Sequence, residues 1–91
     1  MKVKIGKYVY EKSDRKNKKL MTIVDGKKVH FGDNRYEHFK DKTGIYKSLD
    51  HNDSKRRNNY RTRHSKIKNK QGQIVINLPS SPAYHSFRIL W

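Results

Sequence analysis

The strongest constraint on the fold is the dipeptide Asp25-Gly26, which stands between two apolar-rich runs. A two-residue type I′ turn needs a positive φ angle at both central residues, and Asp-Gly is one of the pairs that adopt it most readily. The sequence therefore predicts an antiparallel hairpin in which Leu20–Val24 pairs with Lys27–Phe31. The remaining elements have to be assembled around this hairpin.

Several other segments carry weaker patterns. Apolar and polar residues alternate from Lys2 to Tyr10, which predicts a half-buried strand with a bulge at Gly6. The β-branched run within Gln73–Leu78 predicts a further strand. Residues Arg35 to Leu49 show no clean period, so we expect a loop with one or two short helical turns that aromatic side chains pin to the sheet. The apolar stretch from Ala83 to Trp91 is expected to fold back and close the core, with its terminal indole largely buried.

One helix is expected in the basic middle of the chain. Asn52 or Asp53 can cap its free N–H groups, and the helix should end near Lys66. Tyr60 and Ile67 lie seven residues apart and form a narrow apolar stripe that would face the sheet. Together these elements predict an α+β fold: a three- to four-stranded antiparallel sheet, an N-terminal meander with the Asp-Gly hairpin, packed with one main basic helix in a single domain over residues 1–91.

The charge of the chain indicates its partners. Lys and Arg number 23 and Asp and Glu number 8, so the net charge is +15, well above the magnitude of about 2 to 8 that suits a small soluble domain. All acidic residues lie at or before Asp53, which leaves the second half free of acid. A surface of this kind attracts polyanions, and nucleic acid is the commonest of them in a cell. The candidate phosphate-contacting residues are Lys55, Arg56, Arg57, Arg61, Arg63, Lys66, Lys68 and Lys70. Either Lys2, Lys4 and Lys7 or the loop Arg15–Lys19 would form a second basic surface.

Helical spacing gives this basic stretch an orientation. Arg57, Arg61 and Lys68 should point outward if the apolar stripe faces the sheet. Arg63 or His64 is expected to turn inward to an acid, namely Asp50, Asp53 or Asp33. A run of this kind is also compatible with an ordinary solvated helical face, and only the charge of the whole chain weighs against that interpretation.

The residues give little support to catalysis. The chain has no cysteine, which excludes disulfides and cysteine-ligated zinc. Its five histidines show no recognised metal-ligand spacing, and no glycine-rich phosphate loop or Ser/His/Asp arrangement is present. We therefore assign no catalytic residue, metal ligand or cofactor, and expect no enzyme. A small metal-dependent nuclease that uses His64 and Asp53 is the alternative within the enzyme class. No apolar run approaches the roughly 20 residues of a membrane span, so no membrane partner is expected.

Several short motifs together resemble a known family. They are Lys28-Val29-His30-Phe31-Gly32, then Asp50 and Asp53, then Arg57-x-x-Tyr60-x-x-Arg63-His64, then Pro82 and the terminal Leu90-Trp91. The pattern is similar to that of small basic proteins of unknown function in large double-stranded DNA viruses of eukaryotes, with similar proteins in tailed phages. The resemblance covers about residues 28–91. The chain departs from it at Tyr84-His85-Ser86-Phe87, where the family has a run richer in Trp.

The resemblance implies a viral origin. Combined with the charge, it implies a non-enzymatic, sequence-independent DNA-binding protein that condenses or packages a viral genome, in the virion interior or in a viral factory of the host cytoplasm. The expected partner is double-stranded DNA, with RNA as an alternative and with self-association on the nucleic acid left open. A minor capsid or internal scaffold protein, whose charge meets acidic capsid partners, is the second hypothesis.

Overall fold

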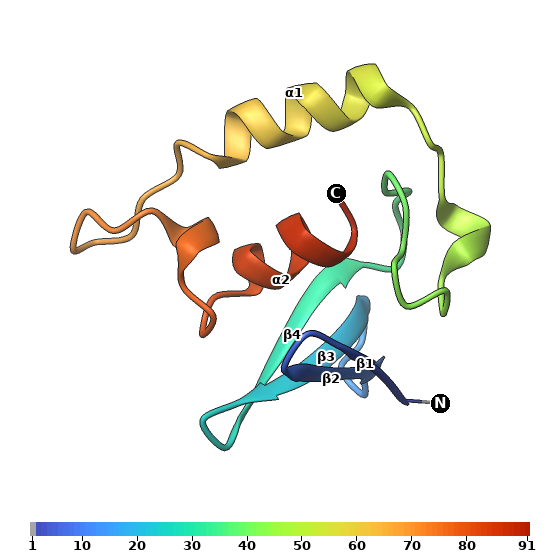
Figure 1. Ribbon diagram of the computed structural model, residues 1–91, viewed down its shortest axis with the longest axis horizontal. Coiled ribbons are helices and arrows are strands. Elements are labelled where there is room, and N and C mark those ends of the chain that lie inside the picture. Colours follow the sequence, from blue (N-terminus) through green and yellow to red (C-terminus); the bar gives the residue numbers. More distant parts are fainter. Residues whose placement is uncertain (1) are drawn as a thin grey trace.

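The computed structural model describes residues 2–91, in which one antiparallel sheet is covered by two helical layers (Figure 1). The strands follow one another in the order β1-β2-β3-β4, each antiparallel to the next. This arrangement confirms the predicted α+β class with its N-terminal meander. In chain order the elements are β1 (Lys2–Ile5), β2 (Tyr8–Lys12), β3 (Lys18–Val24), β4 (Lys27–Asp33), η1 (Lys47–Leu49), α1 (Ser54–His64), η2 (Val75–Asn77) and α2 (Pro82–Ile89).

The N-terminal segment differs from its prediction. Instead of one bulged strand, it forms the two strands β1 and β2, in which Ile5 pairs with Tyr8 and Lys2 pairs with Glu11. Gly6 has a φ angle of 63°, and the chain reverses at this residue rather than passing through a bulge. The apolar positions shift by one between Ile5 and Tyr8, and this shift is compatible with either outcome, because a bulge and a two-residue turn both interrupt the alternation.

The Asp-Gly hairpin is confirmed. Asp25 and Gly26 have φ angles of 51° and 79°, which are the positive values that a type I′ turn requires. Val24 pairs with Lys27, and the pairing continues to Leu20 and Phe31.

The hydrophobic core lies between the sheet and α2. Its fully buried members are Tyr10, Leu20, Phe31, Ile89 and Leu90. The C-terminal segment therefore closes the core as expected, although its helical form was not predicted. Ser81 caps α2 by accepting a hydrogen bond from the Ala83 N–H, and Pro82 occupies the first helical position, where no N–H is needed. The indole of Trp91 is only partly buried.

The strand expected within Gln73–Leu78 is wrong. The segment contains the short 3₁₀ helix η2, and its only bridge to another segment in the described part of the chain joins Ile74 to Lys68. Its apolar side chains are half-buried and η2 packs against α2. The sheet consists of the four N-terminal strands, and this β-branched run packs against α2.

The segment between β4 and α1 forms a loop that contains the single helical turn η1, as expected. Ile45 and Tyr46 pack against the core, so an apolar and an aromatic side chain do tie the loop to the rest of the fold. Helix α1 ends at His64, two residues before the predicted end at Lys66.

Candidate nucleic-acid interface

Helix α1 begins where its capping residue predicts. The Asp53 side chain accepts hydrogen bonds from the N–H groups of Lys55 at 3.0 Å and Arg56 at 3.2 Å, which confirms the expected N-cap. The last turn carries Arg61, Arg63 and His64, and positive charge there is favourable beside the partial negative charge of a helix C-terminus. None of the residues of α1 is buried, so the helix is held by means other than an apolar stripe.

Two arginines of α1 turn inward. Arg57 donates from Nε to the main-chain oxygen of Trp91 at 2.8 Å, and Arg61 donates from Nη1 to the same oxygen at 3.1 Å. The Arg57 guanidinium lies 5.0 Å from the Phe39 ring centre, and that of Arg61 lies 4.0 Å from the Phe87 ring centre. The expectation that both arginines point outward is wrong, because α1 uses them to hold the end of α2.

An aromatic stack replaces the expected contact with the sheet. The Tyr60 ring lies parallel to the Trp91 indole at 4.1 Å and stacks on the His64 ring at 3.8 Å on its other side. Its hydroxyl lies 3.2 Å from Ser86 Oγ, and burial raises the pKa of this phenol. Tyr60 therefore faces α2 rather than the sheet. Ile67 lies beyond the helix and is 43% exposed, so the predicted Tyr60–Ile67 stripe is wrong.

The remaining cations of this region point to solvent and form what we call the outer basic face. Its exposed residues are Lys55, Arg56, Arg63, Lys66, Lys68 and Lys70. Among residues 2–91, Arg56 is the one member of the face with an acidic partner, Glu37 at 3.1 Å. Glu37 was not anticipated, since nothing in the sequence places it beside the helix. Most of the charge of this face is therefore not neutralised by acidic side chains of the described chain.

The loop that carries Lys68 and Lys70 has a defined backbone. The Asn69 N–H donates to the Gln73 carbonyl at 2.9 Å, and the Asn69 side-chain oxygen accepts from the N–H groups of Gln71 and Gln73 at 3.0 Å. An asparagine that bonds nearby backbone groups in this way stabilises a tight turn. Both lysines therefore stand on an ordered turn next to the end of α1.

The N-terminal lysines lie elsewhere. Lys2 and Lys4 belong to the edge strand β1 and Lys7 to the turn after it, and α2 lies between this hairpin and α1 in the view of Figure 1. Lys2 is 3.7 Å from Glu11 and both are at least partly exposed. Exposed lysines on an edge strand also discourage pairing with another chain. The fold therefore does not merge the two sets of predicted cations into one surface.

The acids expected to receive Arg63 or His64 have other partners. Asp33 binds Arg35 at 2.7 Å, Asp50 binds His38, and Asp53 caps α1. His64 and Asp53 stand at opposite ends of α1, a poor arrangement for a shared site. No group of three or more metal-ligating side chains occurs within the described chain.

A buried polar network positions the segment that leads into α1. Lys19 Nζ donates to His38 Nδ1 at 2.8 Å, and His38 donates from Nε2 to Asp50 at 2.5 Å. Lys19 is 2% exposed and His38 is fully buried. Burial, together with the Lys19 charge, lowers the pKa of His38 in spite of Asp50, so the ring stays neutral and bridges the ammonium and the carboxylate.

A second carboxylate extends this network. Asp41 accepts bonds from the backbone and hydroxyl of Thr43 and from the Tyr46 N–H at 2.6 to 2.8 Å. Sequence reasoning missed Asp41, placed Lys19 in a basic surface loop, and expected Asp50 to receive Arg63 or His64 rather than His38. The Asp-x-Thr-Gly pattern at residues 41–44 was the one available signal, since Asp and Thr favour turns in which their side chains bond the backbone.

Comparison with known proteins gives one finding. Residues 8–64 match a family of unknown function, DUF5754, and this range runs from the start of β2 to the last residue of α1. No curated protein and no solved structure matches the chain. The matched region includes the Lys19–His38–Asp50 network and all of α1, whereas α2 lies outside it. Because the match covers more than half of the chain, the protein belongs to the DUF5754 family.

Proposed function

We propose that this protein binds nucleic acid through the phosphate backbone, without reading base sequence, and that double-stranded DNA is its main partner. The observation that carries the proposal is the outer basic face, in which five of the six cations have no acidic partner in the described chain. Side chains of Lys and Arg at such a surface gain affinity mainly by releasing counterions from the phosphates. RNA carries the same charge, so its phosphates are the alternative ligand.

A role in genome condensation follows from two further arguments. The N-terminal lysines form a separate group from the outer basic face, and a small protein with two basic sides can bridge two duplexes. The net charge of +15 opposes close packing of free molecules, and bound polyanion would neutralise it. Self-association would then take place on the nucleic acid. The viral setting, in a virion interior or a viral factory, comes from the motif resemblance alone.

The second candidate is a minor capsid or internal scaffold protein of a virus particle. The same free cations would then meet acidic protein partners instead of phosphates. Nuclease activity has less support, because Asp53 is engaged as a helix cap and His64 in the aromatic stack.

Charge reversal on the outer basic face tests the main proposal. Arg63→Glu with Lys66→Glu changes two exposed residues that have no acidic partner among residues 2–91. The matched control, Lys27→Glu with Lys47→Glu, makes the same charge change at exposed positions in β4 and η1, outside the predicted basic surfaces. Binding of two unrelated duplexes would be measured over a range of salt concentrations, with and without Mg²⁺.

The expected result is weaker binding of both duplexes by the first variant only. The slope of log K against log salt should flatten by about 0.9 for each lost phosphate contact. A slope equal in both variants would remove this face from the binding surface. Loss of binding to one duplex alone would indicate a sequence reader, and no binding at low salt would favour the scaffold role. Mg²⁺-dependent cleavage would favour the nuclease.

A further inference from the structure

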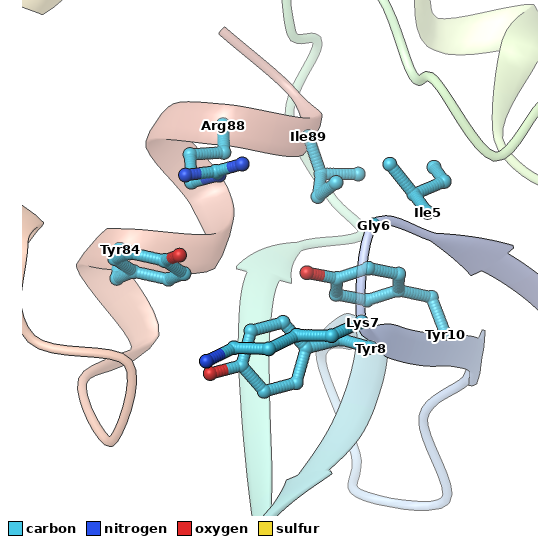
Figure 2. A pocket seen from close by; sticks show the side chains of 8 residues that line it. All are labelled: Ile5, Gly6, Lys7, Tyr8, Tyr10, Tyr84, Arg88 and Ile89. Carbon is cyan, nitrogen blue, oxygen red and sulfur yellow. The ribbon is translucent and has the colours of Figure 1, made fainter.

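A pocket of about 370 Å³ opens between the β1–β2 turn and α2 (Figure 2). Tyr84 and Arg88 contribute from α2, and their i, i+4 spacing places them on one side of that helix. Ser86, which contacts α1 through Tyr60, lies on a different side. The pocket is therefore separate from the outer basic face, and none of its lining residues belongs to α1.

The walls of the pocket are aromatic. Tyr8 and Tyr84 stand edge to face with their ring centres 6.3 Å apart, and Tyr10 forms the floor. Ile5 and Ile89 close the inner end beside the core (Figure 2). Flat aromatic walls of this kind suit a planar aromatic ligand.

The floor of the pocket is held in place by a hydrogen-bonded chain. His85 donates from Nε2 to the Pro79 carbonyl at 2.7 Å, which leaves Nδ1 to accept from the Tyr10 hydroxyl at 2.9 Å. Burial raises the pKa of Tyr10 to about 12, so this hydroxyl keeps its proton. The pocket is thus preformed at its base.

The rim of the pocket is cationic. Lys7 Nζ lies 5.5 Å from the Tyr8 ring centre, and the Arg88 guanidinium lies 5.1 Å from that of Tyr84. No acidic residue lines the pocket, and neither cation has an acidic partner in the part of the chain that the structure describes. The hydroxyls of Tyr8 and Tyr84 likewise have no hydrogen-bond partner within residues 2–91 and are not buried. The cationic groups of Lys7 and Arg88 and the two tyrosine hydroxyls therefore surround a pocket with aromatic walls.

We propose that this pocket binds a single nucleotide unit, an aromatic base that carries a phosphate group. The base lies against the Tyr8 and Tyr84 rings, and the phosphate is held by Lys7 and Arg88 through charge-assisted hydrogen bonds. The volume falls within the range of about 300 to 1,000 Å³ found for small-molecule sites. The unit is either a free mononucleotide or the unpaired end of a nucleic-acid strand, which share this chemistry.

A titration followed by two-dimensional NMR of backbone amides tests the proposal. The probes are adenosine 5′-monophosphate, adenosine, inorganic phosphate and a short thymidine oligonucleotide with a 5′-phosphate. The pocket variant is Lys7→Gln with Arg88→Gln, and a separate Tyr84→Leu variant removes one wall. The control is Arg63→Gln with Lys66→Gln, which removes the same charge from the outer basic face. Unchanged amide signals of β3 and β4 show that each variant is folded.

The monophosphate is expected to shift the signals of Gly6, Lys7 and Tyr84. Its affinity should fall about tenfold or more in the pocket variant, because charge-assisted bonds are lost, and it should also fall in Tyr84→Leu and be unchanged in the control. Adenosine alone and inorganic phosphate alone should each bind more weakly than adenosine 5′-monophosphate does. Binding of the oligonucleotide tighter than that of the monophosphate assigns the site to strand ends, and the reverse assigns it to free nucleotides.

Two results would overturn the proposal: equal affinity of the monophosphate for the wild-type protein and the pocket variant, or signal shifts confined to α1. The control variant Arg63→Gln with Lys66→Gln separates this proposal from that of duplex binding by the outer basic face. It should weaken duplex binding without changing the affinity for the monophosphate, so either site can fail while the other stands.

Discussion

The sheet–α2 half of the molecule and the α1 layer are held by different forces. In the first, Tyr10, Leu20, Phe31, Ile89 and Leu90 are almost completely removed from solvent. In the second, no residue of α1 is buried, and the helix is attached to α2 by a ring stack and by arginine side chains that bind one main-chain oxygen. The free energy gained by apolar burial grows with the buried area. Polar contacts at a surface contribute less to stability, and salt screens those between charges.

The residues that stabilise the fold and the residues that carry the exposed positive charge therefore lie in different parts of the molecule. Most of the folding free energy is expected to lie in the sheet–α2 half, while α1 presents cations on its outer side and uses only its inner side for attachment. A change in the core should therefore unfold the whole chain, and a change at the attachment should release α1 alone.

The largest effect is expected from Phe31→Ala. The side chain is 1% exposed and packs edge to face with Tyr10. Truncation of a buried aromatic costs about 3–5 kcal/mol, so the midpoint of urea unfolding should fall sharply for every probe. A loss confined to the signal from α1 would contradict the assignment of stability to the core.

A smaller and more local effect is expected from Trp91→Ala. The partly buried indole stacks on Tyr60 and lies 5.2 Å from the His51 ring centre. Its loss should cost about 2 kcal/mol, less than expected for the largely buried residue of the sequence prediction. Amide hydrogen exchange should accelerate in α1 and change little in β3 and β4. Equal acceleration in both regions would show that α1 is part of one cooperative unit with the sheet.

Acid should destabilise the fold through two buried histidines, His38 in the loop before α1 and His85 in α2. Burial is the main cause that lowers the pKa of His38 and His85 below the ordinary value of 6.5. The unfolded chain therefore binds protons more readily, and the stabilisation is complete above about pH 6.5 and is lost as the pH falls below it.

Urea unfolding on both sides of that pH measures this effect. The comparison variant is His64→Gln, because the pKa of the less buried His64 is also lowered by burial. It should keep most of the pH dependence, since both fully buried rings remain. A stability that is independent of pH would mean that the pKa values of these histidines are the same in the folded and the unfolded chain.

The smallest effects are expected from a matched pair on α1. Arg57→Gln loses a bond to the Trp91 main-chain oxygen and a contact with Phe39, so it should cost about 1 kcal/mol. Arg63→Gln removes an exposed cation and should change stability by less than about 0.5 kcal/mol. Duplex binding should show the opposite order, with the greater loss for Arg63→Gln. Equal losses of binding would place Arg57 in contact with phosphate after all.

Much of the fold could be predicted because its signals are local. The Asp25-Gly26 turn follows from the φ angles that two neighbouring residues accept, and the start of α1 follows from Asp53 reaching N–H groups two and three residues away. The excess of cationic residues after Asp53 can also be read directly from the sequence. One local failure came from a pattern that two outcomes share: at Gly6 a turn and a bulge both interrupt the alternation.

The sequence by itself determined the hairpin, the cap and the presence of a large free positive charge, since these depend on neighbours in the chain or on composition. Only the tertiary structure decided which arginines carry that charge outward. Arg57 turns inward because Trp91, 34 residues later, brings a main-chain oxygen within 2.8 Å. In the same way, Lys19 is buried because His38 lies within reach of its ammonium. Side chains of one type on one helix differ in role because the contacts that set those roles come from segments far away in sequence, and no local pattern specifies them.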